Sequence, residues 1–123
     1  MTQSIRIGIV GYGNLGRGVE TAIAKNSDMT LIGVFTRRDP DSVETLSATT
    51  PVYSMSQLSE FQDTIDVMIL CGGSKDDLPQ QTPELAKMFN TVDSFDTHAR
   101  IPEFYAAVDA QASAHQKTAL ISA

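Results

Sequence analysis

A glycine-rich turn directly after a short apolar run is the feature that most restricts the folds open to this chain. Ile5 to Val10 (IRIGIV) is apolar and β-branched, and the next six residues, Gly11 to Gly16 (GYGNLG), have the spacing Gly-x-Gly-x-x-Gly. Leu15 to Lys25 then shows helical spacing, with one face formed by Leu15, Val19, Ala22 and Ile23. A strand, a three-glycine turn and a helix in this order are typical of a βα unit that binds a dinucleotide.

Each glycine in this turn is needed for a different physical reason. Gly11 permits a tight turn, Gly13 lets a pyrophosphate approach the backbone because it lacks a β-carbon, and Gly16 lets the helix pack close to the strand. The N–H groups and dipole of the helix then face the anion. The alternative is a glycine-rich turn that binds nothing, although fewer glycines would suffice for a turn.

The rest of the chain repeats this alternation of strand and helix. Further strands are predicted at Thr30–Phe35, Pro51–Tyr53, Asp66–Leu70, Asn90–Val92 and Thr118–Ile121. Further helices are predicted at Ser54–Thr64, Pro79–Phe89 and Ile101–His115, and the second of these starts either at Pro79 or at Thr82. The polar stretch Asp39–Thr50 has little pattern. The prediction is an α/β, Rossmann-type doubly wound parallel sheet of about six strands with helices on both faces. Asp66–Leu70 is apolar throughout, so we expect it to be buried on both faces.

Length and composition exclude several classes of protein. The 123 residues make one domain, here a dinucleotide-binding domain over 1–123, with no room for a second. A net charge of −6 provides no general attraction for nucleic acid or an anionic membrane. A single cysteine, Cys71, excludes an intrachain disulfide and a paired-cysteine zinc site, and we expect no metal. No apolar run spans a membrane and Met1–Ser4 shows no signal peptide, so we expect a cytoplasmic protein.

The end of the second predicted strand indicates which dinucleotide binds. NAD-selective domains usually carry Asp or Glu there, about 20 residues beyond the glycines, to hold the ribose 2′-hydroxyl. This chain instead has Thr36, Arg37 and Arg38. Thr36 can donate a hydrogen bond, and two guanidinium groups can hold a 2′-phosphate, which favours NADP. The alternative is that both arginines are solvated loop charges, and Asp39 could pair with them.

Two later loops follow strands of the same predicted sheet. Cys71–Ser74 contains two glycines, as a backbone close to the pyrophosphate or the nicotinamide ribose requires. Cys71 has no histidine nearby in sequence, so we interpret it as a small apolar residue and not as a nucleophile. In the loop Asp93–His98, Asp96 could bind a substrate ammonium group and His98 could act as acid, base or donor.

Plain structural roles remain open for most of these polar residues. Asp93 and His98 could equally serve a turn and a helix cap before Ile101. Asp76, Asp77 and Glu84 are interpreted as carboxylates near a helix N-terminus, where they complement the helix dipole.

Five segments of the chain resemble the N-terminal portion of the meso-diaminopimelate D-dehydrogenases. They are Ile7–Arg17, Gly33–Arg38, Leu70–Ser74, Asp77–Pro83 and Thr91–His98. The glycine motif is common to many dinucleotide-binding domains, whereas Pro79–Pro83 and Asp93–His98 are much more specific. The resemblance covers essentially the whole chain but only the first part of the family's enzyme.

The resemblance implies an NADP-dependent bacterial enzyme of lysine and peptidoglycan precursor metabolism. Its reaction is the oxidative deamination of meso-2,6-diaminopimelate to L-2-amino-6-oxopimelate, which cyclises to tetrahydrodipicolinate, with release of ammonia. By position, the NADP contacts of the family match Tyr12, Gly13, Asn14, Leu15, Thr36, Arg37, Arg38, Cys71, Gly72, Gly73, Ser74, Ser94, Phe95 and Asp96. Asp96 also matches a substrate contact near the reacting centre.

The resemblance also marks what this chain does not contain. The family continues with a Gly-Trp-Asp-Pro-Gly loop that holds a further part of the substrate, and then with substrate and homodimerisation regions. We therefore expect the cofactor-binding portion alone, with no confident catalytic residue and no activity by itself. One alternative is a stand-alone NADP-binding module or sensor. Another is a different two-domain reductase, such as dihydrodipicolinate reductase or homoserine dehydrogenase. The Asp93–His98 loop argues against both of these reductases.

Overall fold

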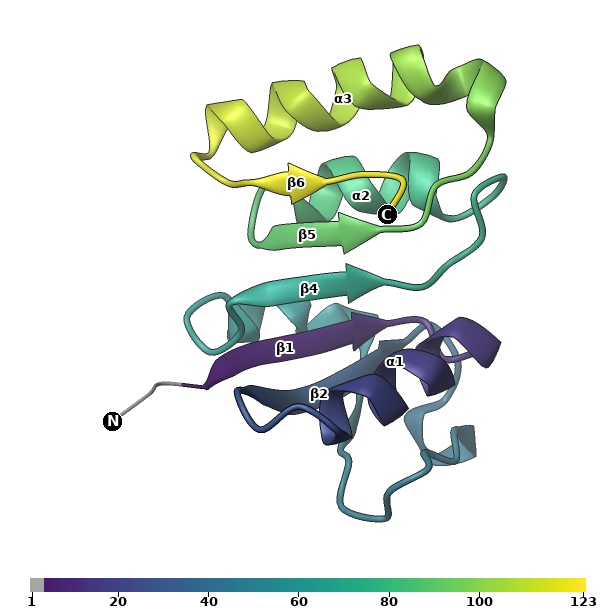
Figure 1. The fold of residues 1–123 in the computed structure, drawn as a ribbon, viewed down its shortest axis with the longest axis vertical. Coiled ribbons are helices and arrows are strands. Elements are labelled where there is room, and N and C mark those ends of the chain that lie inside the picture. The colour runs from purple at the N-terminus through teal and green to yellow at the C-terminus, as the bar shows by residue number, and fades with distance from the viewer. Residues whose placement is uncertain (1–3) are drawn as a thin grey trace.

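The computed structural model describes residues 4–123, in which six parallel strands form one sheet with the order β3-β2-β1-β4-β5-β6 (Figure 1). The prediction made for Met1–Ser4, that this segment is not a signal peptide, falls mostly outside the described residues. The strands are β1 (Ile5–Val10), β2 (Met29–Thr36), β3 (Val52–Ser54), β4 (Val67–Leu70), β5 (Asn90–Asp93) and β6 (Ala119–Leu120). The helices are α1 (Asn14–Ala24), α2 (Leu78–Leu85) and α3 (Ile101–Ala114), with 3₁₀ turns η1 (Pro40–Ser42), η2 (Met55–Phe61) and η3 (His98–Arg100). The predicted Rossmann-type parallel sheet is confirmed.

Two predicted helices differ from the observed ones. The segment predicted as a helix over Ser54–Thr64 is the 3₁₀ turn η2, which begins with a capping box between Ser54 and Gln57. The helix predicted over Pro79–Phe89 is shorter at its end and begins one residue earlier, at Leu78. Pro79 lies in the first turn, where its missing N–H loses no bond, but Pro83 removes the bond to the Pro79 carbonyl.

The two faces of the sheet carry different elements. On one face, α1 packs against β1 and β2, and its core residues include Ile7, Ile9, Ile23 and Val34. On the opposite face, η2, α2 and α3 surround a larger core. That core contains Val10, Phe35, Leu58, Ile65, Met68, Leu70, Leu78, Leu85, Ala86, Phe89, Phe95, Phe104, Val108 and Ala112. Helices therefore lie on both faces, as predicted, but on different parts of the sheet.

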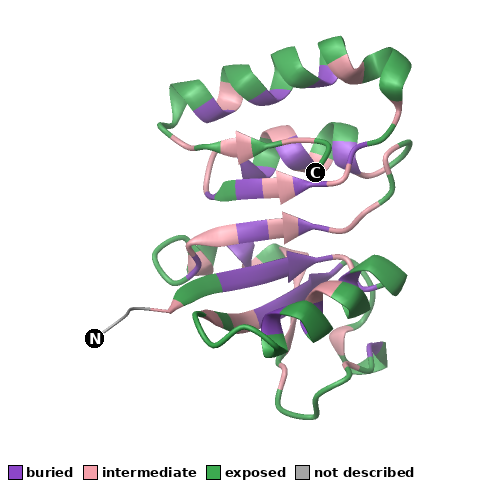
Figure 2. Ribbon diagram, in the orientation of Figure 1, coloured by how far each residue is buried: buried purple, intermediate pink, exposed green. Residues whose placement is uncertain are grey.

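The prediction that the fourth strand is buried on both faces is wrong. Met68 and Leu70 of β4 are buried under the helices, whereas Val67 and Ile69 point to the α1 face and are only half-buried (Figure 2). Among the described residues α1 covers only the β1–β2 part of that face, and Leu120 of β6 is 58% exposed. The apolar composition of β4 therefore overstates its burial.

The strand order places the carboxyl ends of β1, β2 and β4 side by side. The chain moves from β1 to β2 through α1, and β4 then pairs with the other edge of β1. Ligands of open parallel sheets bind where the order of the strands reverses in this way. None of the helices among residues 4–123 is both long and apolar enough to cross a bilayer.

Candidate functional site

An open cavity of about 440 Å³ lies at this point of reversal. Three segments that follow neighbouring strands form most of its wall: Val10–Gly13 after β1, Phe35–Arg38 after β2 and Cys71–Gly73 after β4. Met55, Asp77 and Gln81 complete the wall. The structure therefore brings together three of the four loops that the sequence predicts as a ligand site.

The glycine-rich turn is shaped to leave room for an anion. Gly11 has a φ of +87°, a backbone conformation that residues with a side chain rarely adopt. A β-carbon on Gly16 would lie 2.5 Å from the Gly11 carbonyl oxygen, so this position also requires glycine. A β-carbon on Gly13, in contrast, would meet nothing within 4 Å. Gly13 begins α1, whose first turn has neither a side-chain cap nor an acidic residue. The first N–H groups of α1 and its positive dipole end therefore remain available to a phosphate.

The two arginines after β2 have different partners. Thr36 is buried, and its Oγ1 accepts a hydrogen bond from the Arg38 backbone N–H at 3.0 Å. The Arg38 guanidinium donates to the carbonyl of Tyr12 in the glycine-rich turn at 3.3 Å. The Arg37 guanidinium contacts the carboxylate of Asp77 at 2.6 Å. Asp39 pairs with neither arginine, because its side chain accepts a hydrogen bond from the N–H of Asp41 and begins η1.

A buried carboxylate that the sequence analysis missed connects the glycine-rich turn to the polar loop before β3. Glu20 of α1 is 4% exposed and accepts hydrogen bonds from the Tyr12 hydroxyl, the Thr50 hydroxyl and two backbone N–H groups, those of Leu46 and Ser47. Burial raises the pKa of Glu20, but these bonds together outweigh it and leave the pKa below its ordinary value. Burial, and then the bond to Glu20, raise the pKa of Tyr12.

This carboxylate also corrects the predicted buried face of α1. The buried residues are Gly16, Glu20 and Ile23, whereas Leu15 is 47% exposed and Ala22 is exposed. The positions i, i+4 and i+7 do form one helical face, but a glutamate does not count as apolar in a search for such faces. The helical spacing of Gly16, Glu20 and Ile23 is the sequence signal that could have identified this buried face, if polar residues had been allowed in it.

The loop after β4 packs tightly beside the start of α2. Gly73 donates its N–H to Oδ2 of Asp77 at 2.9 Å, and a β-carbon on Gly72 would lie 2.8 Å from that of Asp77. Oε1 of Gln81 is buried at the cavity wall without a hydrogen-bond partner among the described residues. Burial raises the pKa of Cys71 to about 11, which keeps the thiol protonated at neutral pH and supports its interpretation as a non-nucleophile.

Asp77 lies at the N-terminus of α2, as the sequence predicts, but it has a further role there. It is the N-cap residue without a side-chain cap bond to the helix, and its two oxygens contact Gly73 and Arg37. The prediction for Glu84 is wrong, because Glu84 lies near the end of α2 and pairs with Lys87. Asp77 and Gln81 were both missed as wall residues, because nothing in the local sequence shows that the start of α2 returns to the β2 loop.

The loop after β5 lies beside this cavity rather than in its wall. The Asp96 N–H donates to Oγ of Ser74 at 2.9 Å, which joins the loops that follow β4 and β5. Phe95 is buried and stacks on Phe104, with ring centroids 4.0 Å apart, so its side chain belongs to the core. Asp96 and His98 are exposed. The predicted contacts that do not line the cavity are Asn14, Leu15, Gly16, Ser74, Ser94, Phe95 and Asp96.

Asp93 has a structural role, as one alternative in the sequence analysis states. It is 2% exposed, and its carboxylate accepts hydrogen bonds from the Thr82 hydroxyl and from the backbone N–H groups of Phe95 and Ser122. It thereby holds the end of β5 against α2 and the end of the chain. Among residues 4–123, no group of three or more His, Cys, Asp or Glu side chains is placed to hold a metal ion.

Known proteins resemble this chain over nearly its whole length. It is 60% identical over 120 residues to the meso-diaminopimelate D-dehydrogenase of Lysinibacillus sphaericus, and the match covers 98% of this chain and 36% of that protein. The crystal structure of the Corynebacterium glutamicum diaminopimelate dehydrogenase with diaminopimelate superposes with a TM-score of 0.89 at 44% identity, covering 100% of this chain and 37% of the other. An engineered D-amino acid dehydrogenase bound to NADP⁺ superposes with a TM-score of 0.89 at 43% identity, and the match covers 98% of this chain and 36% of the other.

More distant structures share the fold alone. A homoserine dehydrogenase from S. aureus superposes with a TM-score of 0.75 at 13% identity, covering 99% of this chain and 33% of the other. No protein-family model matches the chain. The chain thus spans about 36% of the length of the relatives that it matches.

Proposed function

We propose that the chain is the NADP-binding portion of a meso-diaminopimelate D-dehydrogenase, because it is similar over almost its whole length to the N-terminal portion of these enzymes. One observation carries the proposal: Arg37 and Arg38, at the end of a strand that lacks a carboxylate, line the same cavity as the glycine-rich turn. NADP needs a glycine-rich turn for its pyrophosphate and basic side chains at the end of the second strand for its 2′-phosphate. The similar engineered D-amino acid dehydrogenase, which is bound to NADP⁺, supports the same choice of cofactor.

Each part of the cavity suits one part of NADP. The open space above Gly13 and the N-terminus of α1 suit the pyrophosphate. The guanidinium groups of Arg37 and Arg38 would hold the 2′-phosphate, with the buried Thr36 fixing the backbone between them. Cys71–Gly73 would adjoin the nicotinamide half, whose ring accepts and donates hydride when the cofactor is bound.

For the whole protein we propose the reaction named by its relatives. In that reaction, NADP oxidises the D-configured amino carbon of meso-2,6-diaminopimelate, and hydrolysis of the imine gives L-2-amino-6-oxopimelate and ammonia. Asp96 is the proposed substrate contact in this chain, since its exposed carboxylate can pair with a substrate ammonium group. The proposed reaction belongs to lysine and peptidoglycan precursor metabolism.

We further propose that the chain alone binds NADP without catalysing this reaction. Hydride transfer requires a substrate held in reacting geometry over the nicotinamide, and Asp96 is the one substrate contact proposed here. Diaminopimelate-dependent reduction of NADP⁺ by the chain should therefore be negligible under conditions where NADPH binding is measurable. Sustained turnover would contradict the proposal of an inactive binding portion.

Mapping of the bound cofactor by NMR tests the site itself. Addition of NADP⁺ to the isotopically labelled chain should shift the backbone amide signals of Gly11–Gly13, Thr36–Arg38 and Cys71–Gly73. Signals near the end of α3, from Ser113 to Lys117, should stay unchanged because this segment lies outside the cavity. Shifts confined to other segments would show that the cavity is not the dinucleotide site.

A further inference from the structure

Asp77 places a negative charge in the cavity proposed for phosphate groups. Its side chain is 20% exposed and lines the wall beside Gly72 and Gly73. Oδ2 accepts the Gly73 N–H at 2.9 Å, and Oδ1 lies 2.6 Å from the guanidinium of Arg37. The charge of Asp77 is therefore balanced by one of the two arginines that face the same cavity.

The two arginines are not equally free to bind a phosphate. Arg38 donates to the Tyr12 carbonyl, a neutral acceptor, and makes no ion pair among the described residues. Arg37 extends from the end of β2 to the loop between β4 and α2, although β1 separates β2 from β4 in the sheet. Its side chain is 67% exposed, so rotation away from Asp77 meets little packing.

We propose that Asp77 is a specificity-determining residue that competes with the ribose 2′-phosphate for Arg37. This inference rests on the proposed function. NADP binding then requires the Arg37 guanidinium to exchange the Asp77 carboxylate for the 2′-phosphate, whereas NAD, which has no 2′-phosphate, leaves the ion pair in place. Asp77 also repels the 2′-phosphate directly. Asp77 thereby makes the affinities for NADP and NAD more alike. Arg38, which has no ion pair of this kind within residues 4–123, would contact the 2′-phosphate without such competition.

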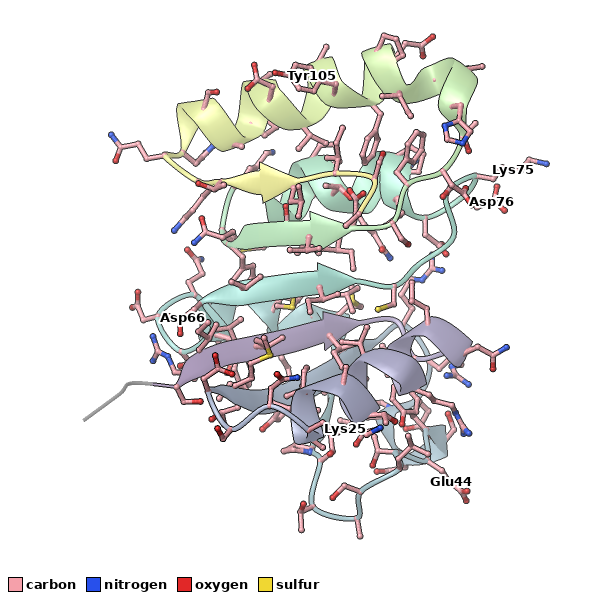
Figure 3. All side chains as sticks on the ribbon, viewed as in Figure 1. Lys25, Glu44, Asp66, Lys75, Asp76 and Tyr105 are labelled. Atoms are coloured by element: carbon pink, nitrogen blue, oxygen red, sulfur yellow. The ribbon has the colours of Figure 1, made fainter. Side chains whose placement is uncertain are left out.

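The substitution Asp77→Asn separates the charge from the geometry. Asparagine has the same size, and its side-chain oxygen can still accept the Gly73 N–H. We expect NADPH to bind about three- to fivefold more tightly, the range that an exposed ion pair supports, and the affinity for NADH to change less. Asp76→Asn is the matched control: it makes the same change in net charge, and Asp76 lies on the outer turn of the loop, outside the cavity wall (Figure 3).

A double-mutant cycle with Arg37→Ala tests whether the effect acts through Arg37. In that background Asp77→Asn should no longer raise the ratio of NADPH to NADH affinity. An unchanged or lower ratio in the single variant, an equal rise in Asp76→Asn, or an equal rise without Arg37 would each overturn the inference. If the unmodified chain does not prefer NADPH, the proposed function fails; if it does and Asp77→Asn leaves the ratio unchanged, only this inference fails.

Discussion

The turn after β1 and the loop after β5 both follow strands of one parallel sheet, yet only the first lies in the wall of the cavity. β1 is at the point where the strand order reverses, with β2 and β4 as its neighbours, whereas β5 lies one strand further out. Neighbouring strands are about 4.8 Å apart, so the β5 loop begins nearly 10 Å from the glycine-rich turn. Its Phe95 packs inward on Phe104. A shared edge of the sheet therefore does not by itself make a shared site.

The largest expected effect is at the β2 side of the cavity. Arg37→Ala combined with Arg38→Ala should weaken NADPH binding about 100-fold, because two charge-assisted contacts to the 2′-phosphate are lost. NADH affinity, measured in the same titrations, should change far less. Arg100→Ala, which removes an exposed arginine outside the cavity, is the control. An equal loss for both dinucleotides would exclude a 2′-phosphate role.

The turn after β1 should respond differently, because it contacts a part that both dinucleotides share. Gly13→Ala should weaken NADPH and NADH alike by about tenfold, as its methyl group would occupy the open space proposed for the pyrophosphate. The free energy of unfolding should not fall, since the added carbon meets nothing within 4 Å. Gly18→Ala, also with nothing within 4 Å but inside α1, should leave both affinities unchanged. Unaltered binding in Gly13→Ala would place the pyrophosphate elsewhere.

Glu20 connects this turn to the loop before β3, and its substitution tests stability. Glu20→Gln should lower the free energy of unfolding by about 1–3 kcal/mol. The amide NH₂ would face hydrogen-bond donors, such as the Ser47 N–H and the Thr50 hydroxyl, whose bonds the carboxylate now accepts. The folded-state pKa of Glu20 is depressed, so its contribution is present above the unfolded pKa and disappears as the pH falls through the folded value.

The pH dependence gives this test its control. The difference in thermal midpoint between the unmodified chain and Glu20→Gln should shrink on acidification, and Glu44→Gln, at an exposed position, should show no such difference. A difference that does not vary with pH would show that the charge of Glu20 has no part in holding the loop.

The smallest effect is expected at the β5 side. Asp96→Asn should change NADPH affinity by about twofold at most, because Asp96 is exposed and lies outside the cavity wall. A tenfold loss, measured by the same titration, would show that this loop binds the cofactor directly, as the resemblance implies, and would remove the contrast between the two loops.

The sequence was sufficient for the sheet and for most of the cavity because both depend on local patterns. Short apolar runs at regular spacing predict the strands, and glycines with fixed spacing predict the turn at Gly11–Gly16. The burial of Glu20 was beyond such reasoning, because its partners, Leu46 to Thr50, lie in a polar loop without a pattern of its own. The contact of Arg37 with Asp77 joins residues 40 positions apart and depends on the final strand order.

A calorimetric titration of the chain with NADPH and with NADH tests the central claim most directly. With two arginines and no carboxylate at the end of β2, NADPH should bind at least about tenfold more tightly than NADH. Equal affinities, or tighter binding of NADH, would contradict the assignment of this cavity as an NADP site.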